Sequence, residues 1–486
     1  MNDATSSDDV KDDLRRRAVT GAVWTMTAQL GLYALRFGGH LIVARLLMPR
    51  AFALMLLITT FLHGLAMFTD IGINASIIQN PDADDRRFLN TAWTLQVVRG
   101  AILWIICVAL TYPYAAFMER DALMTLIPVA GLSVLISGFN STSLATMSRH
   151  LDLKRLMAFR FAVQLVSTLV MIGYALVSPT VWALVAGILV NSVLTLAGSH
   201  LLFDSARNRF EIHRQFFRII IAFGAWVFVN TLLGYLADYV DRYALGKVIQ
   251  DDNLLGCYQV ATNLGGIPFM LLVTVGYSVV FPMMGRAREA GIALRLVYTK
   301  VKLPIFAAGG LAVSGLIATG PLLIQILYKE AFWDAGWMVL PVAAGQWFRI
   351  LAIPPANAVF ALGKIYWLAI ANISKLVGYA LFVPILWRSG GMEAALWGFA
   401  AGESLGVIAY AIAAVQNRLG FPWRDLALTI LVVAVSLGGY ALRTHWVAAG
   451  VSPVIVVLGV GALVSLPWLT MAPSALREIR RSRQGT

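Results

Sequence analysis

The chain has 486 residues, of which 59% are hydrophobic and only 13% are charged, and its mean hydropathy is +0.76. So few charged side chains could not cover the surface of a soluble protein of this length, which excludes a soluble globular fold. The net charge of +13 lies mostly in short segments between apolar stretches. Anionic membrane lipids are therefore the expected partners of these basic residues, and nucleic acid is not.

Apolar stretches of about 20 residues recur along the whole chain, as expected of membrane-spanning helices. Segments rich in charge, proline or glycine separate fourteen of them, with approximate limits 18–44, 51–79, 91–117, 125–147, 157–177, 180–203, 219–246, 254–284, 301–328, 335–361, 365–387, 393–416, 425–443 and 450–472. This pattern predicts an all-α polytopic membrane protein with about 14 transmembrane helices.

The distribution of lysine and arginine predicts the orientation of these helices. The segments on the side of the N-terminus hold 25 basic residues and those on the opposite side hold 7. Because cytoplasmic segments are enriched in basic residues, both termini are expected in the cytoplasm. The first apolar run lacks a small-residue cleavage site, so we expect it to remain as the first span.

A weak internal repeat indicates two lobes. Gly21-Ala22 and Gly224-Ala225 open two spans that run in the same direction, which is typical of parallel repeats. The predicted parts are a cytoplasmic N-terminal tail (1–17), an N-lobe of six spans (18–203), a cytoplasmic interlobe loop (204–218), a C-lobe of six spans (219–416), two further spans (417–472) and a basic cytoplasmic tail (473–486).

Charged residues inside the predicted spans are the strongest functional signal. Apart from charges at the outermost two positions of a span, six are basic and four are acidic: Arg36, Arg99, Arg160, Arg242, Arg349, Lys375, Asp70, Asp238, Asp241 and Glu403. If all ten faced lipid at mid-depth, they would cost roughly 25–35 kcal/mol in total. They must therefore face one another, water or a charged ligand, and the excess of two positive charges suits a carrier of anions.

Each of these residues also has a purely structural interpretation. Asp238 and Arg242 lie four apart on one helical face with Asp241 beside them, so they form either a proton-coupling site or a cluster that locks this helix to a neighbour. The lone cations Arg36, Arg99, Arg349 and Lys375 bind either a phosphate or an acid on another helix.

The acids Asp70 and Glu403 either pair with these cations or relay protons. Arg160 lies so near the start of its span that its side chain is expected to extend to the membrane surface.

Signatures of catalysis are missing from the sequence. We find no Gly-x-Ser-x-Gly, His-Glu-x-x-His, Walker or Cys-x-x-Cys motif. The two cysteines, Cys107 and Cys257, have no metal-ligand spacing. We expect a protein that is not an enzyme and that has no metal site and no cofactor.

Several motifs carry a family resemblance. They are residues 44–54 (Ala-Arg-Leu-Leu-Met-Pro-Arg-Ala-Phe-Ala-Leu), 68–73 (Phe-Thr-Asp-Ile-Gly-Ile), 77–79 (Ile-Ile-Gln), 90–100 (Asn-Thr-Ala-Trp-Thr-Leu-Gln-Val-Val-Arg-Gly), 241–246 (Asp-Arg-Tyr-Ala-Leu-Gly) and 255–258 (Leu-Gly-Cys-Tyr). This set resembles the polysaccharide transporter family, the Wzx-type flippases of the MATE/MOP superfamily, which also includes multidrug extruders and lipid II flippases. Ala53 departs from the pattern, since the family usually has glycine there.

The resemblance implies two six-helix bundles that work by alternating access in the bacterial inner membrane. Its implied cargo is an undecaprenyl-pyrophosphate-linked oligosaccharide for exopolysaccharide, O-antigen or capsule, with a polymerase and export machinery as partners and H⁺ or Na⁺ as a coupling ion. Together with the charge pattern it predicts a cationic cavity of Arg36, Arg99, Arg242, Arg349 and Lys375, with Asp238, Asp241, Glu403 and Asp70 as coupling or cavity acids.

Two other functions compete with this one. A multidrug or cation antiporter of the extruder type would have an acid-dominated cavity, whereas the predicted interior is net positive. A polytopic polymerase or ligase acting on the same lipid carrier would need a sizeable outer loop to hold its acceptor, and the longest outward loop here has about ten residues.

Overall fold

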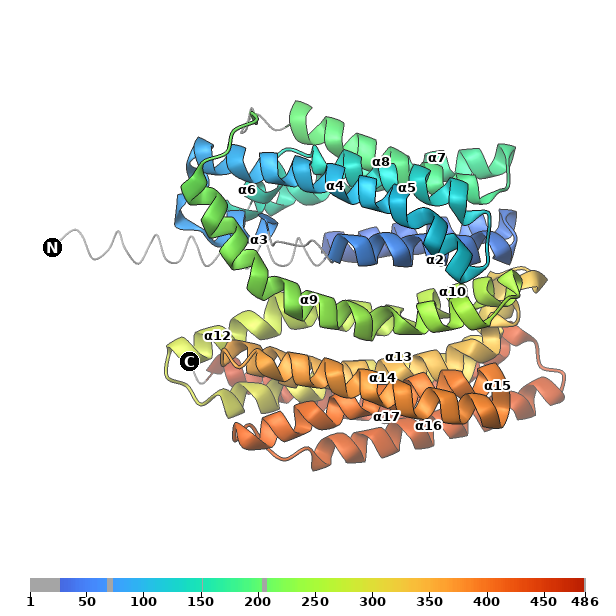
Figure 1. Ribbon diagram of the computed structural model, residues 1–486. Helices are drawn as coiled ribbons and strands as arrows, with labels where there is room; N and C mark the ends of the chain where they lie inside the picture. The colour runs from blue at the N-terminus through green and yellow to red at the C-terminus, as the bar shows by residue number, and fades with distance from the viewer. Residues whose placement is uncertain (1–26, 68–72, 151, 203–207, 485–486) are drawn as a thin grey trace. The chain divides into compact units, whose positions relative to one another are not determined.

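The computed structural model describes residues 27–67, 73–150, 152–202 and 208–484 (Figure 1). Within these ranges the chain is almost entirely helical and contains no strand. Ten helices are long and apolar enough to cross a membrane, or eleven if the bent pair α5 (Leu123–Gly138) and α6 (Ser143–Arg149) forms one span. The prediction of an all-α polytopic membrane protein is therefore confirmed, and the number fourteen stays a prediction.

The backbone separates into two compact units. The first comprises Met1–Tyr235 and Arg242–Gln250, and the second comprises Leu236–Asp241 and Asp251–Thr486. The helix α9 (Arg214–Val248) therefore contributes residues to both units. The predicted limits place residues 214–218 of this helix in the interlobe loop and residues 219–248 in the C-lobe, and they remain a prediction.

The first unit consists of helices that follow one another along the chain. They are the helical residues 27–46, α2 (Pro49–Met67), α3 (Ile73–Gln79), the 3₁₀ turn η1 (Pro81–Asp84), α4 (Arg86–Met118), α5, α6, α7 (Leu153–Val177) and α8 (Val181–Leu201). Asp85 caps α4 by accepting a hydrogen bond from the backbone N–H of Arg87 at 2.8 Å. Such a cap satisfies one of the donors that every helix start leaves unpaired.

The second unit begins with a broken helix and continues with longer ones. Its helices are α10 (Asp252–Gly265), α11 (Ile267–Val275), the π-helical turn η2 (Gly276–Val280), α12 (Phe281–Glu289), α13 (Leu294–Leu327), the 3₁₀ turn η3 (Glu330–Phe332), α14 (Ala335–Ala361), α15 (Tyr366–Gln416), α16 (Trp423–Ala448) and α17 (Pro453–Gln484). The sequence Gly265-Gly266-Ile267-Pro268 lies at the break between α10 and α11. The helix is interrupted there because Pro268 lacks the backbone N–H that would continue the hydrogen-bond pattern.

Two adjacent glycines divide α15 into two limbs. Gly390 and Gly391 have non-helical backbone angles, and the φ of +63° at Gly391 favours glycine. The limbs on either side of this break pack closely, because a Cβ added at Gly378 would lie 2.8 Å from the Cα of Gly402. Small residues at such crossings allow helix backbones to approach within a membrane.

Candidate functional site

Four charged side chains of the second unit form one connected group, which we call the charge cluster. An Nη of Arg349 on α14 donates to Asp238 on α9 across 2.8 Å. Lys375 on the first limb of α15 lies 3.4 Å from the same Asp238 oxygen and 3.2 Å from a carboxylate oxygen of Glu403 on the second limb. The structure therefore joins two of the predicted cavity cations to two of the predicted acids.

Aromatic residues surround the charge cluster. The phenol of Tyr379 donates a hydrogen bond of 2.7 Å to Glu403, and the guanidinium of Arg349 lies 4.4 Å from the ring centroid of Phe269. Nearby on α9, Asp241 accepts a hydrogen bond from the phenol of Tyr258 on α10. These contacts hold each carboxylate in one orientation, and the cation–π contact stabilises a guanidinium that has left water.

The members of the charge cluster differ in their access to solvent. The side chains of Lys375 and Glu403 are only 11% and 10% exposed, and that of Arg349 is 20% exposed, whereas Asp238 is 39% exposed. Two positive and two negative charges balance, which removes most of the cost of placing them in the membrane. Asp238 is thus the member that a proton or a solute reaches most readily.

These charges lie far from the ends of their helices. Arg349 follows the start of α14 by about 21 Å and Lys375 follows the start of α15 by about 14 Å, at 1.5 Å per residue. The hydrocarbon core of a bilayer is about 30 Å thick, so both cations belong to its middle. A balanced cluster at this depth can change its state when one proton or ion arrives.

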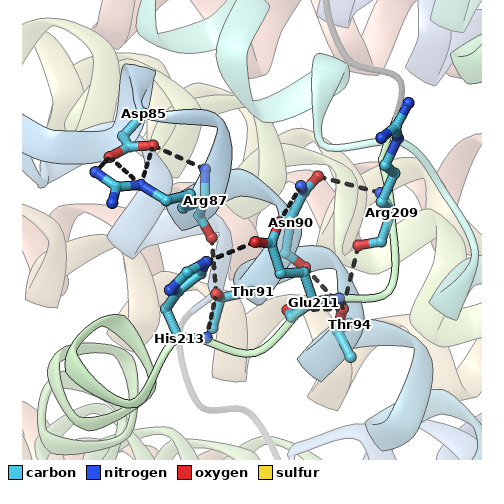
Figure 2. A network of polar contacts seen from close by, with 8 residues as sticks. All are labelled: Asp85, Arg87, Asn90, Thr91, Thr94, Arg209, Glu211 and His213. Atoms are coloured by element: carbon cyan, nitrogen blue, oxygen red, sulfur yellow. Dashed lines mark hydrogen bonds and ion pairs between the residues drawn. The ribbon is translucent and has the colours of Figure 1, made fainter.

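Helix α9 carries Asp238, and the start of this helix is held by a polar network in the first unit (Figure 2). Glu211 accepts hydrogen bonds from the amide of Asn90 on α4 at 2.7 Å and pairs with the ring of His213 at 2.6 Å. The backbone N–H groups of Glu211 and His213 donate to the hydroxyls of Thr94 and Thr91 on α4. The hydrogen bonds from Asn90 and His213 hold the pKa of Glu211 below its usual value.

The other end of α9 is held by a buried arginine. Arg120, which follows α4, donates to the carbonyls of Gly246 at 2.8 Å and Ile249 at 2.7 Å. Beside it, Lys247 pairs with Glu119 at 2.6 Å, and this hydrogen bond lowers the pKa of Glu119. A cation at a helix C-terminus also complements the helix dipole. Both ends of α9 are therefore fixed to the first unit.

Two predicted cations of the first unit donate hydrogen bonds to neutral groups. Arg36 is exposed, and its Nε donates to the amide oxygen of Gln164 on α7 at 2.9 Å. Arg99 on α4 is half-buried and donates to the carbonyl of Ala66 in the last turn of α2 at 2.7 Å. Arg242 is half-buried on α9. Arg36 has no carboxylate within ion-pair distance among the residues that the structure describes.

Some participants were not identified from the sequence. Tyr379 lies one helical turn after Lys375, and Gln164 lies one turn after Arg160, so helical spacing could have indicated both. Tyr258 belongs to a motif of the family resemblance, but nothing in the sequence indicated its contact with Asp241, and no signal pointed to Phe269. The predicted site residue Asp70 lies outside the described residues.

In the part of the chain that the structure describes, no group of three or more His, Cys, Asp or Glu side chains could hold a metal ion.

Comparisons with known proteins agree with this architecture. Teichuronic acid biosynthesis protein TuaB of Bacillus subtilis (strain 168) is 20% identical over 380 residues, which cover 76% of this chain and 74% of TuaB. Lipopolysaccharide biosynthesis protein WzxC of Escherichia coli (strain K12) is 22% identical over 442 residues, which cover 87% of this chain and 88% of WzxC.

A solved structure shares the fold over nearly the whole chain. The lipid II flippase MurJ in an inward closed conformation matches with a TM-score of 0.72 and 12% sequence identity, and the match covers 93% of this chain and 99% of MurJ. A family model described as polysaccharide biosynthesis protein matches residues 42–335, which is more than half of the chain. This multi-pass membrane protein therefore belongs to the polysaccharide biosynthesis protein family.

Proposed function

We propose that this protein is a flippase that carries an undecaprenyl-pyrophosphate-linked oligosaccharide from the inner to the outer leaflet of the bacterial cytoplasmic membrane, for surface polysaccharide biosynthesis. The observation that carries the proposal is membership of the polysaccharide biosynthesis family combined with a fold like that of a lipid II flippase over 93% of the chain. The excess of lysine and arginine in the short segments on the side of the N-terminus supports cytoplasmic termini. The protein acts as a carrier and not as an enzyme.

The chemistry of the cargo explains why charged residues occur in the spans. A pyrophosphate cannot cross hydrocarbon bare, because an ion pays a large desolvation cost there. In this proposal the cationic donors for the headgroup are Arg36, Arg99 and Arg242 of the first unit and Arg349 and Lys375 of the second unit. Guanidinium groups bind two phosphate oxygens at once, which favours them for this task.

The charge cluster supplies a coupling step in this proposal. Asp238 is shared by Arg349 and Lys375 and is the most exposed of the four charged groups. When a proton or cation neutralises Asp238, Arg349 and Lys375 both lose a partner, and Arg349 becomes free to bind the anionic headgroup. Glu403 keeps hold of Lys375 in this step because Tyr379 orients its carboxylate. Transport by alternating access would then be linked to an H⁺ or Na⁺ gradient.

A translocation assay tests the proposal. The full-length protein is reconstituted into liposomes that contain a fluorescent undecaprenyl-pyrophosphate-linked oligosaccharide, and a quencher added outside reports the fraction that reaches the outer leaflet. We expect protein-dependent translocation and a loss of at least about tenfold in Arg99→Ala and Arg349→Ala, because each removes a charged hydrogen bond of about 1.5–3 kcal/mol. Arg388→Ala, which removes an exposed arginine of α15, is the matched control.

Four outcomes would contradict the proposal or part of it. Equal translocation by protein-free and protein-containing liposomes would exclude a flippase. Full activity in both arginine variants would exclude Arg99 and Arg349 as donors that bind the anionic headgroup. Polymerised glycan produced by the purified protein would point to an enzyme instead, and efflux of cationic dyes without glycan translocation would point to a multidrug antiporter.

A further inference from the structure

The contact between helix 27–46 and α7 contains polar groups that the charge cluster does not explain. Arg36 donates to Gln164, and Gln164 in turn donates to the hydroxyl of Thr168 at 3.1 Å. The two helices approach closely beside this contact, since a Cβ at Gly39 would lie 2.5 Å from a methyl carbon of Thr168. The geometry therefore brings the Arg36 guanidinium onto the polar face of α7.

Arg160 lies on that same face, one helical turn before Gln164. It is exposed and close enough to Arg36 for the two charges to repel each other. Within the described ranges, Arg160 makes no hydrogen bond or ion pair, and Arg36 bonds only to a neutral amide. Because no described carboxylate pairs with either guanidinium group, both have N–H donors that are free to bind an anion.

His40 adds a further unsatisfied group. It follows Arg36 by one turn on the same helical face, and its Nδ1 is buried without a hydrogen-bond partner among the described residues. Buried polar atoms usually have a partner, so an unpaired nitrogen here indicates that a ligand group or water completes the site. The site then contains Arg36, His40, Arg160 and Gln164 and carries no negative charge.

The depth of these residues argues against simple contact with lipid. Gln164 follows the start of α7 by about 16 Å, which is about half the thickness of the hydrocarbon core. A cation at that depth that faced acyl chains would cost about 2.5–3.5 kcal/mol even on the lowest scale. Since Arg36 is exposed in the first unit, it faces water or a polar ligand.

We propose that Arg36, Arg160 and Gln164, with His40 beside them, form an oxyanion-binding subsite within the first unit that reads an acidic group of the transported molecule. The guanidinium groups bind the oxyanion, while the amide of Gln164 and the imidazole offer the mixed donors and acceptors that sugar hydroxyls need. The oxyanion comes from either a sugar carboxylate of the glycan or the pyrophosphate of the carrier. This inference rests on the proposed function and specifies the substrate class.

Direct binding of small anions tests the subsite without any transport step. The full-length protein is placed in nanodiscs of phosphatidylcholine, which has no net charge, and sodium glucuronate, sodium pyrophosphate and glucose are titrated by saturation-transfer-difference NMR. We expect at least one of the two anions to bind more tightly than glucose. Its dissociation constant should rise at least about tenfold in Arg36→Gln and Arg160→Gln, because each loses a charged hydrogen bond.

Matched variants separate recognition from folding. Arg155→Gln removes an exposed arginine of the same helix that pairs with Asp152 at 3.7 Å on a different face, and should bind the anion as the wild type does. Arg36→Lys keeps the charge and should retain part of the affinity. A loss confined to glucuronate assigns the subsite to an acidic sugar, and a loss that includes pyrophosphate assigns it to the carrier headgroup.

The proposal is overturned if neither anion binds more tightly than glucose, or if Arg36→Gln and Arg160→Gln both bind the anions as well as the wild type does. In the second case Arg160 would simply extend to the membrane surface. Because these titrations require no translocation, the subsite can fail while the flippase activity stands, and the reverse result is equally distinguishable.

Discussion

Arg349 and Asp238 lie 111 residues apart in the sequence and meet across 2.8 Å in the second unit. The pairing connects α14 to α9, and Lys375 extends it to both limbs of α15 through Glu403. Three helices therefore share one charge balance. A change of charge at Asp238 alters the ion pairs of side chains on all three helices, which is the property that a coupling site needs.

A double-mutant cycle should reveal this pairing as an interaction energy. Arg349→Met leaves Asp238 with one cation fewer and should destabilise the protein by about 1–3 kcal/mol, below the usual range of about 3–5 kcal/mol for a fully buried pair because Asp238 is partly exposed. Asp238→Asn added to it should cost less than the two single changes together. The difference, expected at about 0.5–3 kcal/mol, is measured from denaturant unfolding in detergent.

The control for this cycle is Glu393→Gln, which neutralises an exposed acid on α15 away from the cluster. Combined with Arg349→Met, its effect should simply add. Additive energies for Asp238→Asn and Arg349→Met would contradict the view that this ion pair stabilises the fold.

The close crossing of the two α15 limbs predicts a strong effect of one methyl group. A Cβ at Gly402 would lie 2.3 Å from a ring carbon of Tyr379, whose phenol binds Glu403. Gly402→Ala should therefore lower the unfolding free energy by about 1–3 kcal/mol through overpacking and weaken translocation, because Tyr379 must move. Thermal unfolding and the liposome assay measure the two effects.

Gly438→Ala is the matched control, since a Cβ at this glycine of α16 meets no atom within 4 Å. It should be neutral or stabilise the protein by up to about 1 kcal/mol, because alanine is the better helix former. Equal effects of the two substitutions would show that the limbs are not tightly packed.

The network at the start of α9 predicts a response to acid. The pKa of Glu211 is held below its usual value by the hydrogen bonds from Asn90 and His213, so its contribution to stability is complete above the ordinary glutamate pKa of about 4.3. That contribution is lost as the pH falls through the lowered pKa. The unfolding temperature of the wild type should therefore decline on acidification from pH 6 to pH 3 more than that of Glu211→Gln.

Glu289→Gln, at the exposed end of α12, serves as the control and should show the full acid response of the wild type. An identical response in Glu211→Gln would mean that the hydrogen bonds of Glu211 do not favour its charged form.

Arg120 should be important for stability although it is remote from the charge cluster. Its guanidinium satisfies the carbonyls of Met118, Gly246 and Ile249 in a buried position. Arg120→Met would leave these acceptors unpaired, at about 1–3 kcal/mol for each that water cannot reach. The unfolding temperature should fall markedly, whereas Arg388→Met on the surface should leave it unchanged; a normal value for Arg120→Met would show that water replaces the side chain.

Helical spacing made parts of the site predictable. Lys375 and Tyr379, like Arg36 and His40, are four residues apart, and any α-helix brings such residues onto one face. The partner of each group was not predictable, because Asp238, Arg349 and Glu403 belong to helices whose register against one another depends on packing. The close approach of Gly378 and Gly402, for example, sets where Lys375 meets Glu403.

The sequence by itself determined that the chain is helical and crosses the membrane many times, because lipid leaves no other way to satisfy the backbone of repeated apolar stretches. It also determined that the charges inside those stretches need partners, because hydrocarbon does not solvate them. Only the tertiary structure decided which charges cancel and which do not. In the second unit Arg349 and Lys375 meet carboxylates, whereas in the first unit Arg36 meets the neutral amide of Gln164. The reason is physical: ion pairing acts over a few ångströms, and helix packing alone sets those distances.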